Sequence, residues 1–375
     1  MVGPNAKKID TALLDDIKFN CDISDARFWG YFSICGLLMR YRDLFRSEQG
    51  LDPWDEIKRE EITAWIQQKE SRWPDLELQE FRGITAGARH YDPFDSEGIN
   101  KALASAGILY GAGYGMYLKP TFFLAELKRS YTLEGHSVMV AGRELVRDLF
   151  STPGMLRERQ IVIRLEPLTA LLWDRFQAAR TRPSSLASIA FAGYGLPAET
   201  ASPVAAAALL LTIAEQYADI LVRHELAESL ENRPEWQDIL LSVPDRNVEH
   251  FVRAVKDLLA DTSVHGPLRR IRETKDLPGL GLSTSLLDGY RGALFPELRT
   301  AYEHVSRTGD WTLLEEVRSG GYARFRGLRD EVIELFRAEQ GEGAFDRKLR
   351  ERIQELMRAC EQKSCGTRTV NRPQE

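Results

Sequence analysis

Cysteine and histidine are scarce in this chain, which has only 4 Cys and 6 His among 375 residues. A disulfide framework needs a denser set of cysteines, so we exclude a disulfide-rich secreted scaffold. Cys360 and Cys365 lie close together, but no second cysteine pair or neighbouring histidine completes a zinc ligand set. We therefore interpret the cysteines as free thiols in a reducing cytosol.

Long apolar runs are also missing. The beginning of the chain, MVGPNAKKIDTALL, has no continuous apolar segment and no small-residue cleavage site, so we expect no secretory signal. The most apolar run, Val204–Ala214, is shorter than the roughly 20 residues that cross a bilayer, and we interpret it as part of a buried helix. These features predict a cytoplasmic protein that does not contact a membrane.

An excess of basic residues is absent as well, because 50 Lys and Arg stand against 56 Asp and Glu, a net charge of −6. Proteins that bind nucleic acids electrostatically are usually basic, so this balance argues against a nucleic-acid partner. The glycine-rich segment Gly111–Pro120 has neither the spacing of a P-loop nor a helix after it. We interpret it as a turn before a hairpin.

The chain does contain ordinary core-forming material, since hydrophobic residues make up 43%, enough for a soluble globular protein. Apolar residues recur at helical spacing over Asp22–Ser47, and over Phe28–Met39 they cover nearly every side of the predicted helix. A helix that is apolar all round is usually buried. This helix is therefore predicted to lie in the middle of the fold.

Three segments of the first half predict strands. Thr121–Leu133 and His136–Ala141 are rich in β-branched and aromatic residues, and the Glu-Gly pair between them predicts a hairpin turn. Gln160–Arg164 is a candidate third strand. Between the hairpin and this strand, Arg143–Phe150 is expected to be helical.

After Pro203 the pattern is helical throughout, so we predict a mainly α-helical α+β fold with a small antiparallel β-sheet in the N-terminal half and a helical C-terminal half. The stretch 181–203 is rich in Pro, Gly, Ser and Ala and is the candidate domain boundary. It separates a mixed helix and hairpin region, residues 1–182, from a helical region, residues 200–362. Residues 363–375 are expected to form a disordered tail.

The sharpest chemical candidate is the segment HELAE, near the end of a helix predicted over Val204–Leu230. His224 and Glu228 share one helix face and could bind a divalent metal ion, with Glu225 as general base. The pattern parallels H-E-x-x-H, in which two histidines bind zinc, but Glu228 replaces the second histidine. The sequence identifies no third ligand. The alternative is a solvated helix end, where His224 suits the negative end of the helix dipole.

Arg42 and Arg46 form a second candidate site. They are four positions apart at the end of an apolar stripe, and two guanidinium groups there could bind a carboxylate or phosphate as an anion-binding pair. The alternative is an internal salt-bridge network with Asp43, Glu48 or acidic residues elsewhere. The sequence leaves both interpretations open.

Several segments resemble an uncharacterised bacterial family of unknown function. They are Ile23–Trp54, Tyr91–Asn100, Lys119–Leu127, His224–Glu228, Arg253–Thr262 and Leu294–Leu298. Because these segments are spread over most of the chain, the resemblance is full-length. It implies a bacterial, cytoplasmic protein, and it brings no activity, substrate, cofactor or catalytic residue to this sequence.

Two functions remain as hypotheses. The favoured one is a non-catalytic helical binding or assembly protein, whose helices dock a protein partner or self-associate through an apolar patch. The alternative is a metal-dependent hydrolase or oxidase, with His224 and Glu228 as metal ligands and Glu225 as the base. Bound metal would favour the second hypothesis over the first.

Overall fold

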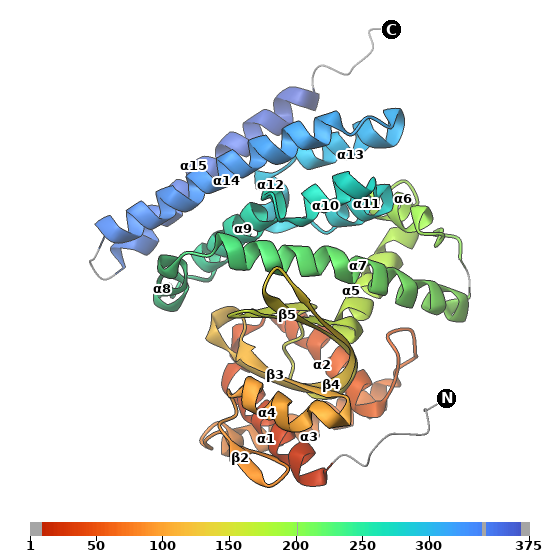
Figure 1. Ribbon diagram of the computed structural model, residues 1–375, viewed down its shortest axis with the longest axis vertical. Helices are drawn as coiled ribbons and strands as arrows, with labels where there is room; N and C mark the ends of the chain where they lie inside the picture. Colours follow the sequence, from red (N-terminus) through yellow and green to blue (C-terminus); the bar gives the residue numbers. More distant parts are fainter. Residues whose placement is uncertain (1–9, 201, 340–342, 369–375) are drawn as a thin grey trace. The chain divides into compact units, whose positions relative to one another are not determined.

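The structure is a computed structural model that describes residues 10–200, 202–339 and 343–368 (Figure 1). The chain divides into two compact units. Unit 1 contains Met1–Gln177 and Thr200–Ala218, and unit 2 contains Ala178–Glu199 and Asp219–Glu375. Helix α7 (Pro203–Glu231) therefore begins in unit 1 and ends in unit 2.

Unit 1 combines helices with two β-sheets. A small sheet pairs β1 with β2, and a larger one has the strand order β3-β4-β5-β7-β6. The elements, in chain order, are α1 (Thr11–Phe28), η1 (Trp29–Tyr31), α2 (Ile34–Gln49), α3 (Arg59–Leu76), β1 (Ile84–Ala86), β2 (Arg89–Tyr91), α4 (Ser96–Leu103), η2 (Ala104–Ala106), β3 (Ile108–Tyr114), η3 (Met116–Leu118), β4 (Pro120–Leu133), β5 (His136–Arg147), β6 (Gly154–Arg157), β7 (Gln160–Arg164) and α5 (Leu165–Arg180).

The larger sheet contains the predicted hairpin. Strands β4 and β5 are antiparallel and meet at Glu134 and Gly135, whose φ values of 47° and 77° suit a tight hairpin turn. The predicted third strand is β7, which pairs with β5 in parallel. The mainly helical α+β fold and the helical second half are thus confirmed, but the sheet is larger than predicted and not wholly antiparallel.

The helix predicted over Arg143–Phe150 is wrong, because residues 143–147 continue strand β5. The register of β4 against β5 shifts at three places near Ala125, as expected for β-bulges. These irregularities interrupt the alternation of apolar and polar residues that would have indicated a long strand.

Strand β3 occupies the first part, Gly111–Tyr114, of the glycine-rich stretch that was predicted to be a turn. Gly111 pairs with Phe123 of β4, and a Cβ atom at Gly111 would lie 1.9 Å from Phe123 Cε1. Only glycine leaves room for the aromatic ring over this strand. The prediction of a turn was wrong for Gly111–Tyr114, because the glycines here admit a side chain from the next strand.

The long helix predicted over Asp22–Ser47 is broken into two. Helix α1 ends at Phe28, the η1 turn follows, and the Ser33 side chain begins α2 by accepting the Gly36 N–H at 3.1 Å. The segment predicted to lie in the middle of the fold is instead on the surface of unit 1. Its exposed apolar side chains, which we call the α2 patch, are Trp29, Tyr31, Ile34, Leu38 and Met39.

A buried charge cluster ties α1 to the larger sheet. Lys119 Nζ lies 2.8 Å from Ser24 Oγ, 3.1 Å from Asp25 Oδ1 and 3.4 Å from Asp148 Oδ1. All three ionisable side chains are at most 2% exposed. Asp25 also accepts the Leu149 N–H at 3.0 Å. Burial, partly offset by Lys119, raises the pKa of Asp25 to about 7.

Unit 2 is helical throughout its described residues. Asp245 begins helix α9 by accepting the N–H groups of Asn247 and Val248, as its sequence position suggests. Besides the end of α7, its helices are α6 (Leu186–Gly193), α8 (Pro234–Ser242), α9 (Arg246–Thr262), α10 (Pro267–Thr274), α11 (Leu277–Ser285), α12 (Gly289–Leu294), α13 (Glu297–Thr308), α14 (Thr312–Ala338) and α15 (Ala344–Arg368). Of the tail expected over 363–375, residues 363–368 have a helical backbone and 369–375 lie outside the described residues.

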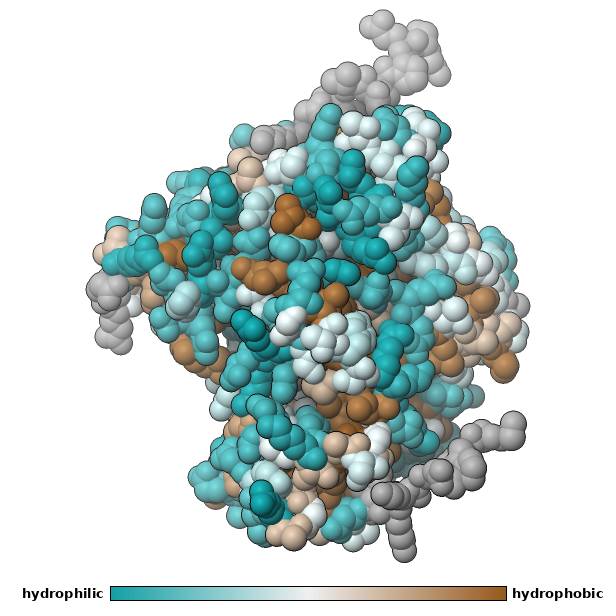
Figure 2. All heavy atoms as spheres, viewed as in Figure 1, coloured by the Kyte–Doolittle hydropathy of each residue, from teal (hydrophilic) through white to brown (hydrophobic). Residues whose placement is uncertain are grey.

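Helix α7 is long and apolar enough, by length and composition alone, to cross a membrane. In its most apolar window 44% of the residues are buried inside the protein. A helix from the core of a soluble protein passes the same test, so this is weak evidence for a span. Figure 2 shows a mainly hydrophilic face of the molecule, on which hydrophobic side chains form small groups.

Candidate functional site

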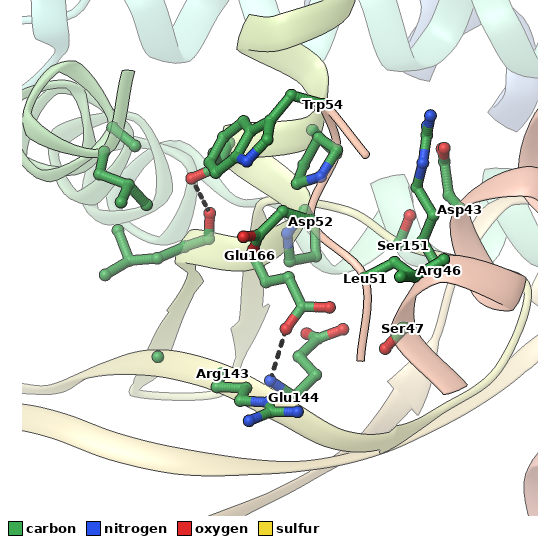
Figure 3. A pocket seen from close by; sticks show the side chains of 18 of the residues that line it. Asp43, Arg46, Ser47, Leu51, Asp52, Trp54, Arg143, Glu144, Ser151 and Glu166 are labelled. Carbon is green, nitrogen blue, oxygen red and sulfur yellow. Dashed lines mark hydrogen bonds between the residues drawn. The ribbon is translucent and has the colours of Figure 1, made fainter. Parts of the chain in front are cut away.

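Unit 1 contains a cavity of about 550 Å³ (Figure 3), a size typical of sites for small molecules. Its wall is formed by the C-terminal half of α2, the following segment 50–54, the irregular part of β5 and the start of α5. Leu211, Thr212, Ala214 and Glu215 of α7 complete it, and they too belong to unit 1.

A glycine forms the turn at the point where α2 ends in this wall. Gly50 ends α2 with a φ of 66°, and its N–H donates to the carbonyls of Arg46 and Ser47. A Cβ atom at Gly50 would lie 3.1 Å from Arg143 Nη2, so the missing side chain allows Arg143 to lie against the turn. The turn thereby brings α2 and β5 together.

Two carboxyl groups lie close together in the cavity wall, as Figure 3 shows for Glu144 and Glu166. Glu166 accepts the backbone N–H of Glu144 at 2.8 Å. Burial raises the pKa of Glu166, and the negative charge of Glu144 raises it further. Glu166 is therefore a more basic carboxylate than an exposed one.

Glu144 and Arg147 keep unsatisfied polar atoms although they are 3% and 7% exposed. Glu144 Oε1 accepts a hydrogen bond of 2.5 Å from Arg164 Nε. Glu144 Oε2 lies 3.4 Å from Arg147 Nε, but neither atom forms a hydrogen bond with the described residues. The distance permits attraction, whereas the orientation leaves one acceptor and one donor unsatisfied.

The structure places Arg42 and Arg46 in the same cavity wall. Arg42 Nε donates to Asp43 at 2.9 Å and its Nη2 donates to Asp174 at 2.7 Å, so Arg42 belongs to a salt-bridge network. Arg46 Nη2 donates to the Asp55 carbonyl at 3.1 Å, and its buried Nε has no hydrogen-bond partner among the described residues. Burial lowers the pKa of Arg46, and the positive charge of Arg42 lowers it further. Of the two arginines, Arg46 is therefore the better hydrogen-bond donor to a bound anion.

In unit 2, His224 and Glu228 of α7 face helix α9. His224 Nδ1 lies 2.7 Å from Asp261 Oδ1, and His224 Nε2 lies 3.8 Å from Glu228 Oε2. Asp257 of α9 is the further carboxylate that the sequence could not identify, because ligand atoms of these three residues, His224, Glu228 and Asp257, lie within 4.8 Å of one another. The structure thus brings both predicted ligands to one place.

This cluster is not a solvated helix end, since the side chains of His224 and Glu228 are 16% and 15% exposed. Burial alone would lower the pKa of His224, but Asp261 beside it raises that pKa to about 10. Burial raises the pKa of Glu225, the predicted base, to about 8. Lys256 Nζ lies 2.5 Å from Glu228 Oε1, and Arg291 Nη1 lies 3.5 Å from Asp257 Oδ2.

Comparison with known families also divides the chain in two, but at a different place from the two structural units. Residues 12–164 match the Family of unknown function (DUF6866) N-terminal domain, and residues 169–359 match the C-terminal domain of that family. The chain belongs to this family. The resemblance seen in the sequence is thus confirmed. No curated protein and no solved structure matches the chain.

The two DUF6866 models meet between the end of β7 and the first turns of α5. The cavity takes Glu144 and Arg147 from the N-terminal model and Asp174 and Glu215 from the C-terminal model. Glu144 and Arg147, unlike Arg42 and Arg46, were not predicted as site residues, because their segment was assigned to a helix. Their i,i+3 spacing is the one signal that could have drawn attention to them.

Proposed function

We propose that the protein is a non-catalytic binding protein whose cavity in unit 1 takes a small zwitterionic molecule. The observation that carries this proposal is the set of buried polar atoms around one space. Arg46, Arg147 and Glu144 line the cavity, and their buried atoms Arg46 Nε, Arg147 Nε and Glu144 Oε2 have no hydrogen-bond partners among the described residues. Such groups are rare in native proteins, and a ligand with both acceptors and donors would satisfy them.

The charge of the lining supports a ligand that carries both signs. Five basic residues (Arg42, Arg46, Lys128, Arg143 and Arg147) stand beside six acidic ones (Asp43, Asp52, Glu144, Glu166, Asp174 and Glu215). A strongly anionic or cationic ligand would meet repulsion from one of the two sets. Leu51, Pro53, Trp54 and Leu211 add apolar surface, so amino acids and short peptides are the class that fits.

The lining also supports binding rather than catalysis. Neither histidine nor cysteine is among the described residues that line the cavity, so a Ser–His or Cys–His pair is not assembled there. The serines of the lining, Ser47 and Ser151, have no histidine beside them in this set. A binding role is the simplest function for this arrangement.

The first test replaces Arg46 by methionine and measures the affinity of amino acids and dipeptides by isothermal titration calorimetry. We expect a zwitterion to bind the parent protein and Arg46→Met to weaken it by about tenfold or more, because a hydrogen bond from a charged donor is lost. Arg59→Met, an exposed arginine at the start of α3, is the matched control and should leave the affinity unchanged.

Three outcomes would contradict the proposal. They are the failure of every amino acid and dipeptide to bind, equal binding of dicarboxylates or neutral sugars, and equal affinity for the parent and Arg46→Met. Circular dichroism of each variant checks that the fold is kept. Glu144→Gln is a second variant, which keeps the side-chain size and should weaken the binding of the ligand's amine end.

A second binding function is favoured by the α2 patch. Ile34 and Leu38 are one helical turn apart and are 81% and 54% exposed, an arrangement that suits docking of a second copy of the chain. We expect the parent protein to dimerise and Ile34→Asp/Leu38→Asp to be monomeric in light scattering. Leu78→Asp changes an apolar residue that is 78% exposed and is not part of the α2 patch, so it should leave the dimer intact. A parent protein that stays monomeric at every concentration would refute this assembly role.

A further inference from the structure

We propose that unit 2 binds a divalent cation of the zinc type through His224 and Glu228 of α7 and Asp257 of α9. The three side chains come from two helices that pack against each other within unit 2. Each offers one ligand atom, and these atoms lie within 4.8 Å of one another, close enough to surround one ion. One imidazole nitrogen and two carboxylate oxygens form the donor set.

The orientation of the His224 ring supports this site. His224 Nδ1 lies 2.7 Å from Asp261 Oδ1, which directs Nε2 towards Glu228 and its Oε2 at 3.8 Å. In metal sites the second ring nitrogen of a ligating histidine usually binds a carboxylate, which fixes the ring. Asp261 is one helical turn after Asp257 on α9, so one face of α9 supplies both a ligand and the residue that positions another.

The charges around the site leave room for a divalent ion. Four carboxyl groups face it, those of Glu225, Glu228, Asp257 and Asp261. Cations accompany them: Lys256 binds Glu228, Arg291 approaches Asp257 at 3.5 Å, and Arg253 adds its positive charge near Glu228. Lys256 occupies Glu228 Oε1 and leaves Oε2 on the side of His224.

The donor set indicates which ion is bound. Imidazole nitrogen combined with carboxylate oxygen suits Zn²⁺ and, less tightly, Mn²⁺. Calcium and magnesium prefer oxygen ligands alone, so neither should compete at similar concentration. The order of affinity is therefore expected to be Zn²⁺, then Mn²⁺, then Ca²⁺.

The test is a calorimetric titration of the full chain, free of any affinity tag and treated with a chelator, with Zn²⁺ alone. We expect one ion per chain, and a loss of affinity of about tenfold or more in His224→Asn and in Asp257→Asn. The matched control is His304→Asn, because His304 also pairs with a carboxylate in unit 2, with Nε2 at 3.6 Å from Asp310 Oδ2. This control should bind Zn²⁺ as the parent does.

Lys256→Met separates a cation site from a structural ion-pair network. Removing the ammonium group frees Glu228 Oε1, so Zn²⁺ should bind more tightly to this variant if the site is real. Asp261→Asn should weaken Zn²⁺ binding because it no longer fixes the orientation of the His224 ring. It replaces His224→Asn in the test if that variant does not fold. The proposal is overturned if the parent binds no Zn²⁺, if His304→Asn loses as much affinity as His224→Asn, or if Lys256→Met binds Zn²⁺ less tightly.

Discussion

Replacing Lys119 by methionine is expected to lower the free energy of unfolding by about 3–5 kcal/mol, the usual cost of leaving a buried charge without its partner. Lys119 Nζ is the cation between the carboxyl groups of Asp25 and Asp148. Methionine fills a similar volume but leaves both groups facing each other in a site that water does not reach. Their repulsion and lost hydrogen bonds cause the expected loss.

The size of this effect should depend on pH. Without Lys119, the folded-state pKa of Asp25, already about 7 in the parent, rises further, while in the unfolded chain it returns to about 3.8. A carboxyl group with a raised folded-state pKa binds its proton more readily in the native state. The deficit of Lys119→Met should therefore shrink as the pH falls from about 8 to about 5.

Urea unfolding followed by circular dichroism at several pH values measures both effects. Lys101→Met is the matched control, because Lys101 pairs with Glu97 at 2.6 Å on the surface, where both side chains are mostly exposed. This control should not change stability measurably. A deficit for Lys119→Met that is negligible, or that grows as the pH falls, would show that the cluster does not act as described.

Replacing Gly266 by alanine is expected to lower the free energy of unfolding of unit 2 by about 3 kcal/mol. Gly266 precedes α10, and a Cβ atom there would lie 2.1 Å from the Ala260 carbonyl oxygen and 2.8 Å from that of Asp261. Both are backbone atoms at the end of α9, so they cannot rotate away and the turn must shift. The expected cost is thus that of overpacking a tight turn.

Gly320→Ala is the matched control for this substitution. Gly320 lies within α14, and nothing lies within 4 Å of a Cβ atom added there. Because alanine is the better helix former, we expect this control to gain about 0.5–1 kcal/mol. Thermal or urea unfolding of the two variants gives opposite shifts if the clash is the cause. Equal shifts would contradict it.

The helices and the hairpin could be predicted because their signals are local. The amphipathic stripe of α9, its cap at Asp245 and the Glu-Gly turn each depend on residues a few positions apart. Strand β3 and the end of β5 could not be predicted in this way. The reason for a glycine at position 111 becomes clear only when Phe123 is seen to lie over it. The break between α1 and α2 is likewise invisible in an apolar composition that continues through Phe28–Met39.

The candidate sites show the same limit. The i,i+4 spacing of His224 and Glu228 was visible in the sequence, whereas Asp257 and Asp261 lie on another helix and carry no signal of their partner. Arg42 and Arg46 were found by their spacing, but the sequence could not show that Arg42 donates a hydrogen bond to Asp174. Local sequence patterns do not show which side chains meet through tertiary packing.

The path of the chain through unit 1 has a consequence for folding during synthesis. Unit 1 is interrupted, because the chain leaves it at Gln177 and returns at Thr200. Lys128 of β4 pairs with Glu215 of α7, 87 positions later, across the wall of the cavity. A nascent chain that has emerged only to the end of β7 therefore lacks part of this wall. We expect the cavity to acquire its closed form late in translation, after residues beyond Glu215 have left the ribosome.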